Sequence, residues 1–117
     1  MYSPALLDHF QNPRNAGAVE NADAIARVEN PVCGDVLELS AKVKDGYIVD
    51  MRFKAKGCVP SMACGSAITD LAKGKSLAVA REIRMEDVLQ KVAGLPEASG
   101  HAGVLAVDAL KAVLRNL

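Results

Sequence analysis

Two short segments carry side chains that could bind a metal. The first is Pro31-Val32-Cys33-Gly34-Asp35, in which a thiol and a carboxylate flank a glycine that allows the backbone to turn sharply. A thiolate beside a carboxylate is electrostatically unfavourable unless a cation lies between them. This pair therefore favours metal ligation over nucleophilic catalysis, and an ordinary turn with a buried cysteine stays open as the alternative.

The second segment is Gly57-Cys58-Val59-Pro60, which follows a predicted strand and precedes a predicted helix. A thiol at a helix N-terminus faces unpaired N–H groups and the positive end of the helix dipole, and both favour the thiolate. In an antiparallel meander, the start of the second strand and the end of the third lie at one end of the sheet. Cys33 and Cys58 are therefore expected to converge.

Three further residues have weaker claims to a functional role. Cys64 shares a helical stripe with Ile68 and Leu71, which favours core packing, with a reserve ligand or sulfur acceptor as the alternative. His101 stands just before the C-terminal helix, and its ring could point into a shared site or lie in solvent. His9 has no partner at a suggestive spacing, so we expect an exposed or half-buried helix residue.

A β-hairpin is predicted to position the two segments. Apolar residues alternate with polar ones on both sides of Asp45-Gly46, and this dipeptide between alternating runs is typical of a tight hairpin turn. The residues expected on the apolar face are Leu37, Leu39, Ala41, Val43, Val49, Met51, Phe53 and Ala55. A first strand is expected over residues 24–30.

Helices are expected to cover the apolar face of this sheet. They are predicted over residues 3–11 with Ser3 as N-cap, 61–73 with Gly74 as the stop, 76–82 and 85–93. A C-terminal amphipathic helix places its apolar stripe on Val107, Leu110, Leu114 and Leu117. The fold class predicted is α+β, a three-stranded antiparallel β-sheet with helices packed on one face, in a single domain over residues 1–117.

Composition excludes several classes of function. Fourteen basic and fourteen acidic residues give a formal net charge of zero, which argues against nucleic-acid binding. No stretch approaches the ~20 apolar residues of a membrane span, and the N-terminus lacks the features of a signal peptide, so we expect no membrane association and a cytoplasmic location. His101 is the only reasonable general base, and no Ser/His/Asp or glycine-rich phosphate motif accompanies it. We therefore expect that the protein is not an enzyme.

At these residues the chain resembles the IscU/NifU family of iron–sulfur cluster assembly scaffolds. The resemblance covers nearly the whole chain and follows the same order as the family's motifs. The matching stretches are Asp8-His9-Phe10-Gln11-Asn12-Pro13-Arg14-Asn15, Cys33-Gly34-Asp35, Phe53-Lys54, Gly57-Cys58, Gly65-Ser66-Ala67, Lys73-Gly74-Lys75 and Asp108-Ala109-Leu110.

The resemblance implies a site, a cargo and partners. The family assembles a labile cluster, usually [2Fe-2S], with sulfur from a cysteine desulfurase, and transfers it to apo iron–sulfur proteins. Carried over, Cys33 and Cys58 would be thiolate ligands and Asp35 the carboxylate that keeps the site labile. The family's third cysteine is Ala102 here. His101 would complete the set, and this mixture of S, N and O donors also suits zinc, which isolated family members often hold.

One further departure concerns a chaperone. Many relatives carry a Leu-Pro-Pro-Val-Lys motif that a dedicated Hsp70 chaperone recognises. Here the segment is Leu95-Pro96-Glu97-Ala98-Ser99, in which only the first two residues match. The resemblance therefore gives little support for chaperone-assisted transfer.

Overall fold

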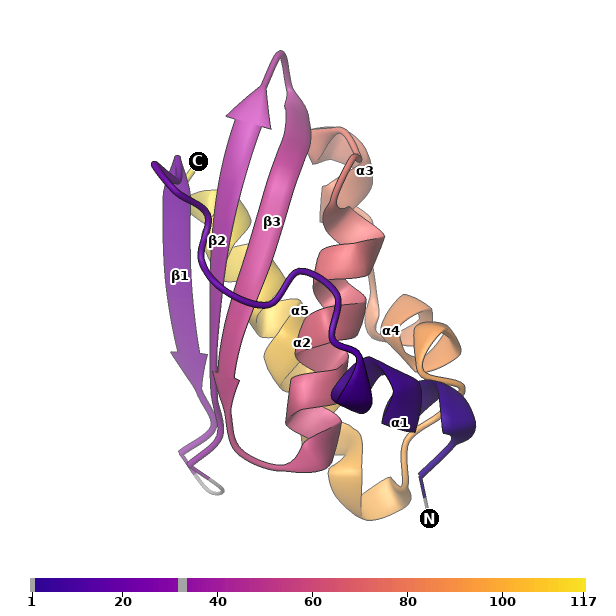
Figure 1. The fold of residues 1–117 in the computed structure, drawn as a ribbon. Helices are drawn as coiled ribbons and strands as arrows, with labels where there is room; N and C mark the ends of the chain where they lie inside the picture. The colour runs from indigo at the N-terminus through magenta and orange to yellow at the C-terminus, as the bar shows by residue number, and fades with distance from the viewer. Residues whose placement is uncertain (1, 32–33) are drawn as a thin grey trace.

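The computed structural model of the protein describes residues 2–31 and 34–117. Its sheet has three antiparallel strands in the order β1-β2-β3: β1 (Ala24–Glu29), β2 (Val36–Lys44) and β3 (Tyr47–Lys56). The helices lie together on one face of this sheet (Figure 1). The predicted α+β class, with helices packed on one face, is confirmed.

The hairpin turn is as predicted, but part of the β3 face is not. Asp45 and Gly46 both have positive φ, as the mirror-image turns of tight hairpins require. Val49, expected in the core, is 47% exposed, whereas Ile48 is fully buried. Lys42 pairs with Asp50 while the next residue, Val43, pairs with Ile48, so Val49 is an extra residue in the ladder. Such a bulge reverses the alternation of side chains locally.

The helices follow the predicted order with small shifts at their ends. They are α1 (Pro4–Gln11), α2 (Val59–Ala72), α3 (Leu77–Arg81), α4 (Met85–Lys91) and α5 (Gly100–Arg115), with a short 3₁₀ turn η1 (Glu97–Ser99). α2 begins two residues earlier than expected, because Pro60 is well accommodated in a first helical turn. α5 ends at Arg115, so Leu117 lies beyond the helix and is 40% exposed instead of joining the core stripe. No helix among the described residues is long and apolar enough to cross a bilayer.

Two long helices form the core with the sheet. α2 packs against β3, α5 packs against β1 and β2, and α1 packs against α2. The largest fully enclosed side chains come from α1, β2, β3, α2 and α5 and include Leu6, Leu39, Met51, Ile68 and Leu110. On the other face of the sheet, the connection from α1 to β1 crosses the strands (Figure 1). There the Val19 N–H donates to Ser40 Oγ at 2.9 Å.

Candidate metal centre

The register of the sheet brings Asp35 beside the end of β3. Val36, the first residue of β2, pairs with Lys56, the last residue of β3. Asp35 therefore lies opposite Gly57. The connection before it is closed by backbone hydrogen bonds from Gly34 N–H to the Asn30 carbonyl (2.7 Å) and from Asn30 N–H to the Asp35 carbonyl (2.8 Å). Gly34 has a φ of 72°, consistent with the sharp turn predicted there.

Gly57 leaves room for the Asp35 carboxylate. Its φ of 149° lies in a region that side-chain-bearing residues rarely adopt, and a Cβ built there would lie 2.3 Å from Asp35 Oδ1. Backbone and carboxylate can approach this closely only because residue 57 is glycine. The next residue, Cys58, is the N-cap of α2, so the carboxylate and the thiol lie at the start of the same helix.

Three donor atoms converge at this end of the molecule. Asp35 Oδ2 is 3.3 Å from Cys58 Sγ and 3.3 Å from His101 Nε2, and Cys58 Sγ is 3.9 Å from His101 Nε2. His101 arrives from the first turn of α5. Ligands bound at about 2.0–2.3 Å to a tetrahedral metal lie about 3.3–3.8 Å from one another. Two of the three separations fall within this range, and the Cys58–His101 distance of 3.9 Å lies just above it. The three atoms could therefore bind one tetrahedral cation after a small movement of the His101 or Cys58 side chain.

Asp35 is a buried carboxylate, only 5% exposed. Burial raises its pKa, but hydrogen bonds from Ser61 and Cys58, together with the nearby His101, outweigh this and leave the pKa below the usual value. The group is therefore ionised at neutral pH. A buried negative charge is stabilised when it is paired, and a metal cation would supply that pairing.

Ser61 is a part of this cluster that sequence reasoning missed. Its hydroxyl, fully buried, donates to Asp35 Oδ2 at 2.7 Å and lies 3.2 Å from Cys58 Sγ. Cys58 is the N-cap of α2 and Ser61 follows three residues later, a spacing at which side chains meet across the first helical turn. That spacing was the available signal. Ser61 orients the carboxylate but is not one of the three candidate metal ligands.

Removing the Ser61 hydroxyl is expected to weaken metal binding. In Ser61→Ala, Asp35 loses the hydrogen bond that fixes its orientation, and such supporting bonds are typically worth about 10–100-fold in metal affinity. We expect zinc to bind at least tenfold more weakly in competition with a chromophoric chelator. Ser76→Ala is the matched control, because it removes a capping hydroxyl at α3, away from the donors. Unchanged zinc affinity in Ser61→Ala would remove the positioning role.

The cysteines occupy different environments. Cys33 lies outside the described residues. Cys64 is fully buried in the core among side chains of the sheet and α5, as its helical stripe predicted. Burial, with a smaller effect of Cys58, raises the pKa of the Cys64 thiol to about 12. A thiol that keeps its proton to so high a pH is a poor metal ligand. Ala102 is also buried, and its methyl group offers no donor atom. Among the described residues, the donor group therefore contains one thiol, that of Cys58.

His9 is not the exposed or half-buried residue expected from the sequence. It is 5% exposed, and its Nδ1 lies 2.8 Å from Ser66 Oγ on α2. The same hydroxyl accepts a hydrogen bond from the Arg14 N–H at 2.8 Å. The expectation failed because these partners are more than 50 residues apart along the chain. His9 is a docking contact between α1 and α2, away from the donor cluster.

Acid is expected to destabilise the fold through His9. Burial, with a smaller contribution from the Arg14 charge, holds the pKa of His9 below its ordinary value of about 6.5. The unfolded chain therefore takes up a proton first as pH falls, so the stabilisation is complete above about pH 6.5 and is lost towards the lower folded-state pKa. Urea unfolding at a series of pH values should show this loss. The slope of the free energy of unfolding against pH should flatten in His9→Gln and persist in His101→Gln. An equal slope in His9→Gln and the wild type would contradict the role of His9.

The chain matches the family described as the NifU-like N terminal domain over residues 1–117. It is 45% identical over 111 residues to iron-sulfur cluster assembly scaffold protein IscU 1 of Archaeoglobus fulgidus, covering 95% of this chain and 72% of that protein. It is 42% identical over 119 residues to the IscU scaffold protein of Escherichia coli K12, covering 98% and 92%. A solved NifU-like N-terminal structure from Brucella abortus superposes with a TM-score of 0.76 at 23% identity over 97% of this chain and 92% of that one, which supports the fold.

Proposed function

The chain belongs to the NifU-like N-terminal domain family, and we propose that it is an iron–sulfur cluster assembly scaffold, which holds a labile [2Fe-2S] cluster and passes it to apo-proteins. The observation that carries this proposal is the convergence of Asp35, Cys58 and His101, whose donor atoms all lie within 4.8 Å of one another. The cluster is the cargo of the protein and not a permanent cofactor.

The mixture of donors suits a cargo that must be released. The Cys58 sulfur is a soft ligand that matches cluster iron, whereas the Asp35 oxygen is hard and a poor match. A scaffold that bound the cluster through thiolates alone would retain it more strongly. We assign Cys33 as a second thiolate on the basis of the family resemblance and His101 as the remaining ligand.

Two kinds of partner follow from this assignment. A cysteine desulfurase would supply sulfur as a persulfide, and apo iron–sulfur proteins would receive the finished cluster. Cys58 is partly exposed, which supports its role as the acceptor. Its thiolate would attack the outer sulfur of the desulfurase persulfide, so that a new S–S bond forms on Cys58 and the desulfurase cysteine leaves as a thiolate. The protein then acts as a binding and transfer module and not as an enzyme.

Anaerobic reconstitution tests the proposal directly. The protein is incubated anaerobically with ferric iron, sulfide and a thiol that keeps the cysteines reduced, then desalted and mixed with an apo-ferredoxin. We expect visible charge-transfer absorption that moves to the ferredoxin. A protein that stays colourless after reconstitution would overturn the scaffold function.

Changing the donor atom at position 35 should change the rate of transfer. Asp35→Cys replaces the hard oxygen by a soft sulfur, so we expect cluster transfer to apo-ferredoxin to slow by at least about tenfold, equivalent to about 1.4 kcal/mol in the barrier. Asp35→Asn, which keeps the size of the side chain but removes its charge, should load less cluster. If Asp35→Cys transfers as fast as the wild type, Asp35 is not the group that makes the site labile.

A second candidate function is favoured by the described donor set itself. One sulfur, one nitrogen and one oxygen are a normal protein ligand set for zinc with its fourth position open. In this alternative the protein is a zinc-binding sulfur acceptor that works with a cysteine desulfurase. It predicts about one zinc per chain as purified, no colour after reconstitution and a persulfide mass on Cys58 after desulfurase treatment.

A further inference from the structure

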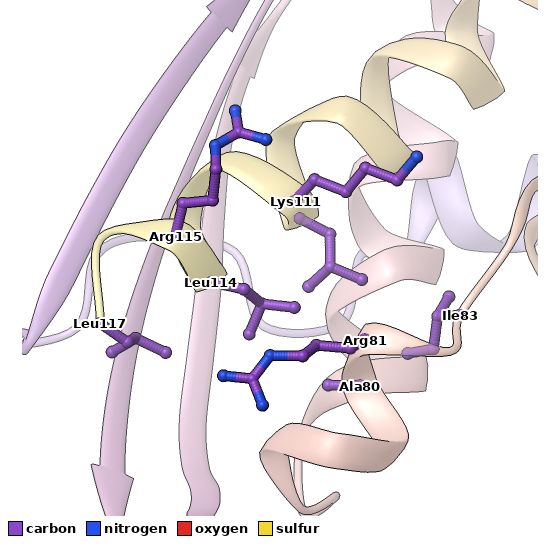
Figure 2. A pocket seen from close by; sticks show the side chains of 8 residues that line it. Ala80, Arg81, Ile83, Lys111, Leu114, Arg115 and Leu117 are labelled. Carbon is purple, nitrogen blue, oxygen red and sulfur yellow. The ribbon is translucent and has the colours of Figure 1, made fainter.

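A hollow of about 440 Å³ lies between the end of α3 and the last turns of α5. Its apolar lining includes Ile83, Leu110 and Leu114, with Leu117 at its margin. Figure 2 shows Leu114 on α5 on one side of this space and Ile83, in the connection that follows α3, on the other. The volume falls within the range of about 300–1,000 Å³ that is typical of ligand-binding pockets.

Three cationic side chains surround the apolar lining. Arg81 extends below Leu114 towards Leu117, and Lys111 and Arg115 stand on α5 above the hollow (Figure 2). None of the described residues that line the hollow is acidic. Within the described ranges, 2–31 and 34–117, none of these three cations forms an ion pair. Their charges are therefore available to an external partner.

Helix dipoles account for only part of this arrangement. Arg81 and Arg115 lie in the last turns of α3 and α5, where a positive charge is stabilised by the helix dipole. Lys111 is four residues earlier on α5 and gains little from that effect. The dipole also gives no reason for the apolar side chain of Leu117 to remain 40% exposed beside the cations.

We propose that this hollow is a docking site for an acidic, amphipathic helical segment of a partner protein. Acidic side chains of the segment would pair with the three rim cations, and its apolar side chains would enter the hollow between them. The long stems of Arg81 and Lys111 would add apolar contact along the edges. Nucleic acid fits less well, because apolar side chains share the lining with the cations and the chain carries no net positive charge.

The position of the hollow leaves the donor cluster free. α5 runs from His101, one of the three donors, to Arg115 at the hollow. Fourteen residues at 1.5 Å per residue separate the two by about 21 Å. A partner held at the hollow would be tethered at a raised effective concentration while the donors remain open to exchange. The docking site does not depend on the nature of the cargo.

A synthetic peptide tests the docking site. The probe is a fluorescein-labelled helix of about 14 residues, four turns, with leucines along one face and glutamates flanking them. Its counterpart carries lysine in place of every glutamate. Fluorescence anisotropy should show binding of the glutamate peptide that weakens as salt is raised, and no binding of the lysine peptide. The triple variant Arg81→Gln/Lys111→Gln/Arg115→Gln should bind the glutamate peptide at least tenfold more weakly.

Three controls separate docking from general effects. Arg27→Gln/Lys44→Gln/Lys54→Gln removes the same charge from the sheet strands and should bind normally. Leu117→Ser should weaken binding about threefold, since it removes apolar contact at an exposed position. Asp35→Ala should bind the peptide like the wild type even if it cannot hold a cluster, so failure of the scaffold proposal and failure of docking are distinguishable.

Two outcomes would overturn the proposal. If both triple variants bind the glutamate peptide equally weakly, the peptide is attracted by the overall charge of the protein alone. Binding of dodecanoate at the hollow, without binding of the glutamate peptide, would identify a pocket for a small anionic amphiphile in place of a protein-docking site.

Discussion

Replacing Cys58 by alanine is expected to abolish cluster loading and to weaken zinc binding at least 100-fold. Cys58 is the one thiol in the described donor group, and its sulfur lies 3.3 Å from Asp35 Oδ2. Losing a direct soft ligand should exceed the roughly 10–100-fold cost of losing a supporting hydrogen bond. The measurements are the visible absorption after anaerobic reconstitution and a zinc competition titration.

Cys64→Ala is the matched control for this prediction. Cys64 is a cysteine on the same helix, but it is buried in the core and its pKa is raised to about 12. We expect normal loading and a loss of about 1 kcal/mol in the free energy of unfolding, because the substitution leaves a small cavity. Loss of colour in Cys64→Ala, with colour retained in Cys58→Ala, would reverse the assignment of the two thiols.

Gly57→Ala is expected to damage the same site through the backbone. The added Cβ would stand 2.3 Å from Asp35 Oδ1, so the carboxylate must leave the position in which its Oδ2 meets Cys58 and His101. The positive φ adds strain of about 1–3 kcal/mol. We expect zinc affinity to fall by at least tenfold and the free energy of unfolding to fall by more than about 1 kcal/mol.

Gly74→Ala distinguishes steric displacement from backbone strain. Gly74 follows the end of α2 with a φ of 84°, yet a Cβ there would meet nothing within 4 Å. This variant should lose some stability and keep its zinc affinity. If Gly57→Ala and Gly74→Ala retain zinc equally well, the close contact between Gly57 and Asp35 does not shape the site.

Local pattern was sufficient for most of the fold. Alternating residues around Asp45-Gly46 predicted the hairpin, Ser3 predicted the start of α1, and the apolar stripe of the C-terminal segment predicted α5. These features depend on neighbours within a few residues, which is the range over which side-chain periodicity and capping act. The bulge at Val49 was missed because it depends on pairing with β2, which the alternation within β3 does not reveal.

The sequence by itself determined the elements, the residues able to act as donors and the resemblance to a scaffold family. Only the tertiary structure decided which of those residues meet. It brought Asp35, Cys58 and His101 together across 66 residues of chain, added Ser61 to them, and enclosed Cys64 and His9 elsewhere. The physical reason is that a donor group is made by the sheet register and by helix packing, which join segments far apart in the chain and leave no periodic trace in any one of them.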